Sequence, residues 1–272
     1  MKKLRVFDTQ EQFENVKCNL EKSVCKVKES ESIFLKKDNY FIAYYDVKSI
    51  SDSTKLLGFD LSNITQISSM YIDDVKVTPM TEYTFSNIGI HKVKCEINSC
   101  TFTTCYKMFN DCKNLIDINL NNLDTSKVTN MSNMFYGCYG LEIIDLSSID
   151  TSNVTNMSAM FGTCINLKDI ITDNIDTSKV TNMSGMFGHC YSLTSLSLTN
   201  FDTSSLESID VMFYECLRLT YLNLSTFNLS KVTNMRSIFA EPNANVLLVI
   251  DCEYLDKWNE ITIPITWDVQ CE

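Results

Sequence analysis

Hydrophobic positions recur along this chain with a strict period of 26 residues. A phenylalanine holds one place in six successive copies, and a cysteine holds another place three residues later in five of them. The phenylalanines are Phe109, Phe135, Phe161, Phe187, Phe213 and Phe239, and the cysteines are Cys112, Cys138, Cys164, Cys190 and Cys216. A period of this length is typical of a solenoid, in which each unit is too small to bury its own apolar face and stacks on its neighbours.

Two apolar spacings divide each repeat, as the copy around Phe135 illustrates. From Val128 to Phe135 the apolar residues fall at offsets of 3, 6 and 7, which is typical of one face of a helix. From Leu141 to Leu146 they have the spacing of a short strand that follows a turn. We expect each unit to contain one or two helical turns, a bend at Gly137-Cys138 and a strand. The predicted fold class is α/β, a leucine-rich-repeat solenoid preceded by a small, mainly β N-terminal region.

The solenoid is predicted to cover residues 99–250, with further regions on either side. Residues 1–39 are expected to form a small helix-plus-hairpin element, residues 40–98 a small β domain that caps the repeats, and residues 251–272 a C-terminal cap. In the β domain, short apolar-alternating runs predict strands at Tyr40–Val47, Lys55–Leu61, Met70–Val77, Glu82–Phe85 and His91–Ile97.

The C-terminal end departs from the repeat pattern. Leu247–Ile250 is expected to form a last repeat strand, Glu253–Trp258 a short helix and Ile261–Val269 a closing strand. Trp258 and Trp267 are expected to cover the apolar end of the stack.

Aspartates form a polar row with the same period. They are Asp124, Asp150, Asp176 and Asp202. Stacked about 5 Å apart, such carboxylates would repel each other, and calcium could relieve that repulsion. The alternative is that each aspartate caps a following backbone N–H. Asn98 and Asn228 hold the same place in the end copies and favour caps, because asparagine caps equally well without a charge.

Asparagines form a second polar row, whose side-chain amides are expected to bond to one another along the stack, donor to acceptor, and to tie the repeats together. These residues are Asn130, Asn156, Asn182 and Asn234.

The cysteine row predicts free, buried thiols. Equivalent side chains in a stack point in parallel, so neighbouring cysteines do not face each other as a disulfide requires. Zinc is the alternative, but the chain has no Cys-x-x-Cys pair. We therefore expect these cysteines to act as small core residues.

Composition narrows the classes of partner. The chain carries 23 Lys and Arg against 34 Asp and Glu, a formal net charge of −11, which disfavours a nucleic-acid surface. No window approaches the ~18 apolar residues of a membrane span, and the amino terminus lacks the apolar stretch of a secretory signal. We expect the protein in the cytoplasm or in a virus particle.

Groups suited to catalysis are scarce. The chain has two histidines, His91 and His189, and no nucleophile elbow, phosphate-binding loop or paired-acid motif. We expect no enzymatic activity, no cofactor and no metal.

The variable positions beside each repeat strand are the predicted binding surface, because a solenoid presents them as one continuous face. They are Asp117, Asn119, Ile143, Asp145, Asp169, Ile171, Ser195, Ser197, Tyr221 and Asn223. Ile143, Ile171 and Tyr221 are apolar or aromatic where solvent is expected, which is typical of an interface. The alternative is that single exposed apolar residues are normal on any protein surface.

The repeat resembles the BspA-like leucine-rich-repeat family through the motif D-T-S-x-V-T-N-M-S-x-M-F-x-x-C-x-x-L at 124–141, 150–167 and 176–193. The resemblance spans about residues 99–250 and implies a solenoid of surface-displayed repeats used in adhesion and protein binding. Leu123, Ile149 and Ile175 depart from the common repeat, which has asparagine or cysteine at that place. Display on a cell surface is implied by this resemblance alone. Residues 83–97 look like a lead-in to such repeats in gut bacteria, and residues 4–22 are similar to short amino-terminal modules of those bacteria and their phages.

Three functions fit these observations. The first is a non-enzymatic recognition or adhesion protein whose solenoid binds a protein or glycan. The second is a structural component of a phage virion, docked to other virion proteins through its N-terminal region with the repeats projecting outward. The third is an intracellular protein-interaction scaffold.

Overall fold

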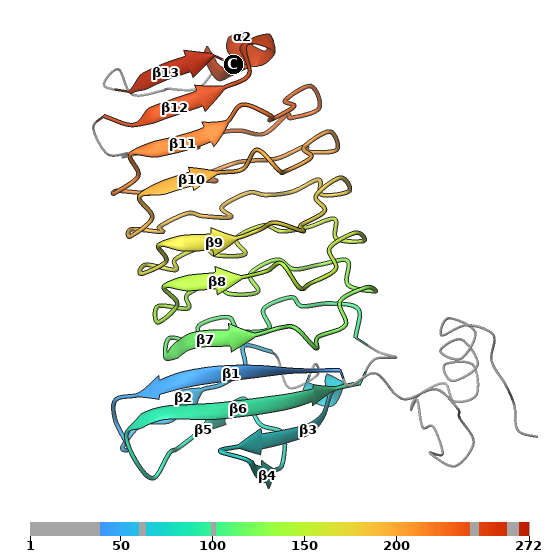
Figure 1. The fold of residues 1–272 in the computed structure, drawn as a ribbon, viewed down its shortest axis with the longest axis vertical. Coiled ribbons are helices and arrows are strands. Elements are labelled where there is room, and N and C mark those ends of the chain that lie inside the picture. Colours follow the sequence, from blue (N-terminus) through green and yellow to red (C-terminus); the bar gives the residue numbers. More distant parts are fainter. Residues whose placement is uncertain (1–38, 60–63, 99–101, 240–244, 260–266, 272) are drawn as a thin grey trace, which may run out of the picture.

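The computed structural model describes residues 39–59, 64–98, 102–239, 245–259 and 267–271. Its repeats form coils that stack along the long axis of the molecule, with their strands in one row (Figure 1). The predicted solenoid with turns of about 26 residues and the β-sheet region before it are confirmed. The predicted helix-plus-hairpin element of residues 1–39 lies outside the described residues, apart from Asn39.

A five-stranded sheet forms the N-terminal end, in the order β4-β3-β6-β1-β7. Its strands are β1 (Tyr40–Val47), β3 (Ile67–Ile72), β4 (Val75–Val77), β6 (Gly89–Ile97) and β7 (Leu115–Asn119). Side chains of β1 and β6 alternate between the core and the surface, as a half-buried antiparallel sheet requires. Because β7 belongs to the first repeat and pairs with β1, the sheet continues directly into the solenoid.

Three of the strand predictions in this region need correction. Met70–Val77 is a hairpin of two strands, because Asp73 and Asp74 turn the chain with φ values of 48° and 66°. Only Glu82–Tyr83 (β5) of the run 82–85 is a strand, and it pairs with Thr54–Lys55 (β2). Of the predicted strand Lys55–Leu61, only Lys55 lies in a strand among the described residues. The chain then turns toward the first coil, where the Gly58 N–H donates to the Met108 carbonyl at 2.9 Å. A single 3-10 turn, η1 (Ile64–Gln66), precedes β3.

The repeat strands are short and parallel. They are β8 (Ile143–Asp145), β9 (Asp169–Ile171), β10 (Ser195–Ser197), β11 (Tyr221–Leu224), β12 (Leu247–Ile250) and β13 (Asp268–Cys271). Paired strands from β8 to β12 are in register at one repeat, as in Ser195 opposite Tyr221. Hydrogen-bonded pairing joins β8 to β9 and runs from β10 to β13, whereas β7 and β8 belong to different sheets.

The predicted helical turns are wrong, and the described repeats contain very little helix. In the segment from Met131 to Cys138, every second N–H donates to the next coil: Phe135 N–H, for example, bonds to Met160 O at 2.9 Å. The N–H groups between them close tight turns, such as Met134 to Met131 at 3.2 Å. Asn133 and Gly137 have φ values of 56° and 70°, which interrupt a right-handed helix. The apolar residues have the spacing of a helix, but every second backbone hydrogen bond of this segment runs from one coil to the next.

A second ladder runs along the coils at the asparagine row. Parallel bridges connect equivalent residues Thr104, Asn130, Asn156, Asn182, Ser208 and Asn234. In each interior asparagine the side-chain oxygen accepts the N–H two residues later, as in Asn130 to Ser132 at 2.9 Å. The side-chain oxygens therefore fix a local turn, where bonding between neighbouring amides was expected, and backbone groups carry the bonding between coils.

Stacked phenylalanine rings fill the centre of the solenoid. Neighbouring rings from Phe109 to Phe239 have centroids 5.4–6.0 Å apart, and their planes differ by 2–13°. Phe41 of β1 closes one end edge-on at 5.0 Å. At the other end, Trp267 and Trp258 lie 4.7 Å and 6.4 Å from Phe239. Both tryptophans are buried, so they cover the end of the stack as expected.

The C-terminal cap contains the only α-helix among the described residues, α2 (Leu255–Asn259), which follows the 3-10 turn η2 (Cys252–Tyr254). In the described part of the chain, no helix is long and apolar enough to cross a bilayer. The closing strand predicted at Ile261–Val269 is observed as β13, which begins at Asp268, and residues 261–266 of the prediction lie outside the described residues.

Candidate functional site

The predicted binding residues all lie at outward positions of the repeat strands, and we call this surface the strand face. It consists of Asp117, Asn119, Ile143, Asp145, Asp169, Ile171, Ser195, Ser197, Tyr221 and Asn223. The first eight are exposed, and Tyr221 and Asn223 are half-buried. Because the residue between the two outward positions of each strand is buried in the core, the face is built on a regular, packed support.

Aliphatic and acidic side chains meet on the part of the strand face formed by β7, β8 and β9. Ile143 is 55% exposed and Ile171 is 37% exposed. Asp145 lies two residues from Ile143 on β8, Asp169 lies two residues from Ile171 on β9, and Asp117 lies on the neighbouring strand β7. This part of the face therefore combines apolar area with negative charge.

A hollow lies where the ladder between β7 and β8 is missing. It is lined by Ile116, Asp117, Gly140, Glu142 and Ile143. Gly140 allows the two coils to approach there, since a Cβ on it would lie 2.5 Å from the Leu115 carbonyl oxygen. The strand face is therefore hollowed between β7 and β8.

Several polar side chains of the face are held by their own backbone. The Asp145 carboxylate accepts the Ser147 N–H at 2.8 Å, and the hydrogen bonds from Ser147 lower the pKa of Asp145. Asn119 accepts the Asn121 N–H at 3.0 Å, and Asn223 accepts the Ser225 N–H at 2.9 Å. These groups are ordered before any partner arrives, which reduces the entropy cost of binding.

The face continues onto the N-terminal sheet, which sequence reasoning missed. Tyr44 lies opposite Asp117 across the β1–β7 pair, and Ile42 lies opposite Asn119. On the other side of β1 they face Lys92 and Lys94. The alternation of β1 indicated which residues point outward, but the contact between β1 and β7 joins residues far apart in sequence and left no local signal.

The cysteine row forms a column inside the solenoid. Each interior thiol donates to the phenylalanine carbonyl of the preceding coil, as in Cys164 to Phe135 at 3.0 Å and Cys190 to Phe161 at 3.2 Å. Burial raises the pKa of Cys164 to about 12, and that of Cys216 likewise to about 12. Such thiols stay protonated and unreactive at neutral pH.

Each member of the aspartate row accepts the N–H of the serine two residues later, for example Asp176 from Ser178 and Asp202 from Ser204, both at 2.9 Å. Each aspartate therefore makes the hydrogen bond expected of a capping residue. The segment that it caps is a turn, whereas a helix was expected. These hydrogen bonds lower the pKa of both carboxyls. In the described ranges, no three His, Cys, Asp or Glu side chains gather to hold a metal ion.

A buried threonine column beside the aspartates was not identified as a structural element from the sequence. It consists of Thr125, Thr151, Thr177 and Thr203, each 1–2% exposed. The Thr151 hydroxyl donates to the Asp176 carbonyl at 2.9 Å and accepts the Asp176 N–H at 2.8 Å. The sequence does indicate this column, because all four repeats have threonine at the same place.

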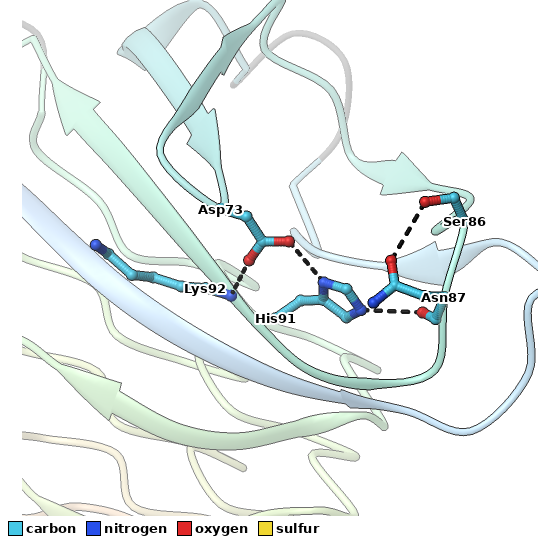
Figure 2. Close-up of polar contacts among 5 residues, drawn as sticks. All are labelled: Asp73, Ser86, Asn87, His91 and Lys92. Carbon is cyan, nitrogen blue, oxygen red and sulfur yellow. Dashed lines mark hydrogen bonds and ion pairs between the residues drawn. The ribbon is translucent and has the colours of Figure 1, made fainter.

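A His–Asp contact in the N-terminal sheet resembles part of a catalytic site. His91 Nδ1 lies 2.7 Å from Asp73 Oδ2, and its Nε2 lies 3.0 Å from the Asn87 carbonyl (Figure 2). Ser86 donates to the Asn87 side-chain oxygen at 3.2 Å and makes no bond to the ring. The printed contacts of the His91 ring are therefore with a carboxylate and a backbone carbonyl, and the cluster ties the turn before β6 to the turn after β3.

Comparison with known families adds to this geometry. A family model described as "Mycoplasma protein of unknown function, DUF285" matches residues 42–142, 103–195 and 138–247. Together the matches run from residue 42 to residue 247, well over half of the 272-residue chain.

The chain belongs to the DUF285 family.

Overlapping matches of one DUF285 model are what an internal repeat produces, and they agree with the stacked coils. No curated protein and no solved structure matches the chain. Because the DUF285 description assigns no function, the surface chemistry of the coils has to indicate one.

Proposed function

We propose that this DUF285 protein is a non-enzymatic recognition protein whose strand face binds a protein partner. The observation that carries the proposal is the exposure of Ile143 and Ile171 on adjacent strands. Burying such side chains against a partner is worth ~1.5–3 kcal/mol each. Isolated apolar residues need no explanation, but these two occupy paired strands of an ordered surface.

The charge around the isoleucines supports a partner with a basic rim. Asp145 and Asp169 flank them, and Asp117 lies on the next strand. The nearby Glu142 is paired with Lys168 at 2.7 Å, which leaves the aspartates as the dominant charges of this area. A partner that places aliphatic side chains against Ile143 and Ile171, with Lys or Arg around them, complements the face.

The repeat motif supports the same proposal. Residues 124–141, 150–167 and 176–193 resemble BspA-like leucine-rich repeats, whose family is associated with adhesion and protein binding. A protein partner is favoured over a glycan because the centre of the face is aliphatic, whereas aromatic side chains lie at its edges in Tyr44 and Tyr221.

Site-specific photo-crosslinking tests the proposal in cells that carry the protein. A photoreactive residue at Ser197, an exposed position of the strand face, should capture one discrete protein. The double substitution Ile143→Glu/Ile171→Glu should abolish the capture, because it puts two charges into the apolar contact. The matched control is Val75→Glu, since Val75 is 65% exposed on the opposite face of the N-terminal sheet and should leave capture unchanged.

Equal capture by the double variant and by wild type would contradict the assignment of this face. Capture of carbohydrate in place of protein would contradict the proposed class of partner. The folding of each variant is checked by its urea unfolding midpoint, so that loss of capture through unfolding is recognised.

A further inference from the structure

The C-terminal end holds a pair of cysteines that differs from all the others described. Cys252 and Cys271 are exposed, whereas Cys95, Cys105 and the cysteine column are buried. Buried thiols are shielded from reagents, so only the exposed pair is available for chemistry among the described residues.

Strand pairing brings the two exposed cysteines together. β13 pairs in parallel with β12, and Cys271 lies opposite Ile250, two residues before Cys252. Asp251 caps the turn that carries Cys252, accepting the Glu253 N–H at 2.8 Å. The two thiols interact directly, and this contact is the first cause that raises the pKa of Cys252.

We propose that Cys252 and Cys271 form a disulfide that fixes the closing strand β13 to the end of the solenoid. The oxidant is a low-molecular-weight disulfide. One of the two thiolates attacks it, forms a mixed disulfide and releases one thiol. The second cysteine then attacks the mixed disulfide and releases the other thiol, so that two protons and two electrons pass from the protein to the oxidant.

The consequence follows from what β13 covers. Trp267 immediately precedes β13 and packs on Phe239 at the end of the ring stack. The disulfide closes the chain between residues 252 and 271, which removes freedom from the unfolded segment. Oxidation therefore keeps the end cap in place and leaves the core of the solenoid unchanged.

Tryptic digestion gives a direct test, because Lys257 separates the two cysteines into different peptides. The full-length protein is incubated with oxidised glutathione in alkaline buffer, alkylated and digested without reductant. A disulfide appears as a linked pair of peptides, 237–257 with 258–272, that falls apart on reduction. In the variants Cys252→Ser and Cys271→Ser, the remaining thiol should instead carry a glutathione adduct.

The expected result is that the linked pair becomes the main oxidised product in the wild-type protein. Its melting temperature should rise by roughly 5 °C on oxidation, with no such rise in either variant. The proposal is overturned if both thiols remain free, if each carries its own glutathione, or if Cys252 links to Cys18, Cys25 or Cys100.

Discussion

Replacing the buried threonine of one coil by valine tests how the coils are held together. Thr151 is 2% exposed, and its hydroxyl satisfies both the N–H and the carbonyl of Asp176 in the next coil. Valine has the same shape and is more apolar. A purely hydrophobic account of this core therefore predicts that Thr151→Val is neutral or stabilising.

The hydrogen bonds predict the opposite sign. Each buried backbone group that loses its partner costs about 1–3 kcal/mol. The Asp176 side chain is exposed, so water reaches part of its backbone and the lower half of that range applies. We expect Thr151→Val to lower the free energy of unfolding by about 2 kcal/mol in total.

Urea unfolding of matched variants measures this effect. Thr151→Ser keeps the hydroxyl and loses one methyl group, which should cost about 1 kcal/mol. Thr155→Val changes an exposed threonine of the same coil and should stay within about 0.5 kcal/mol of wild type. The urea midpoints are compared only between variants whose unfolding free energy depends on urea concentration with the same slope, because a repeat array need not unfold in one step. The reasoning fails if Thr151→Val is as stable as wild type, or more stable than Thr151→Ser.

Two further predictions concern single positions. Gly137→Ala should destabilise by about 1–2 kcal/mol, because Gly137 has φ of 70° and a Cβ there would lie 2.6 Å from Asp111 Oδ1. Gly188→Ala, whose nearest contact would be 3.4 Å, is the control, and equal urea midpoints for the two variants would contradict the strain argument. Partial burial raises the pKa of Asp73, but hydrogen bonds from His91 and Lys92 outweigh it and hold the pKa below its usual value. The carboxylate thus stabilises the fold at neutral pH, and this contribution is lost as pH falls below about 4 through the folded-state pKa. Asp73→Asn should flatten the acid limb of stability against pH, and an unchanged limb would contradict the assignment.

The stacking of the coils could be predicted from the sequence because it depends on spacing alone. A strict period places Phe135 beside Phe161, whatever backbone connects them. The positions of the repeat strands could be predicted for the same reason. The apolar run from Leu141 to Leu146 is too short for a helix and contains the observed strand β8.

The helical interpretation was wrong because the same apolar spacing suits two backbones. The left-handed residues that distinguish them include Gly137 and Asn133, whose residue types favour positive φ, but also Ala159 and Val211, whose types do not. A β-branched residue such as Val211 is a poor candidate for positive φ, so local propensity could not locate these turns. Bonding between coils imposes the conformation.

The extent of the strand face could be predicted only in part. Repeat positions such as Ile143 and Ile171 follow from the period, whereas Tyr44 joins the face through a strand pair outside the repeats. The pair Cys252 and Cys271 depends on the docking of β13, which lies beyond the repeat pattern altogether.

Hydrogen bonds between coils are the basis of this account, and scalar couplings across hydrogen bonds detect them one by one. In a long-range HNCO experiment on deuterated protein, the amide nitrogen of Phe135 should correlate with the carbonyl of Met160, and that of Phe161 with the carbonyl of Met186. Correlations from these amides to Met131 and Met157, four residues earlier, would instead indicate α-helical repeats and contradict the account.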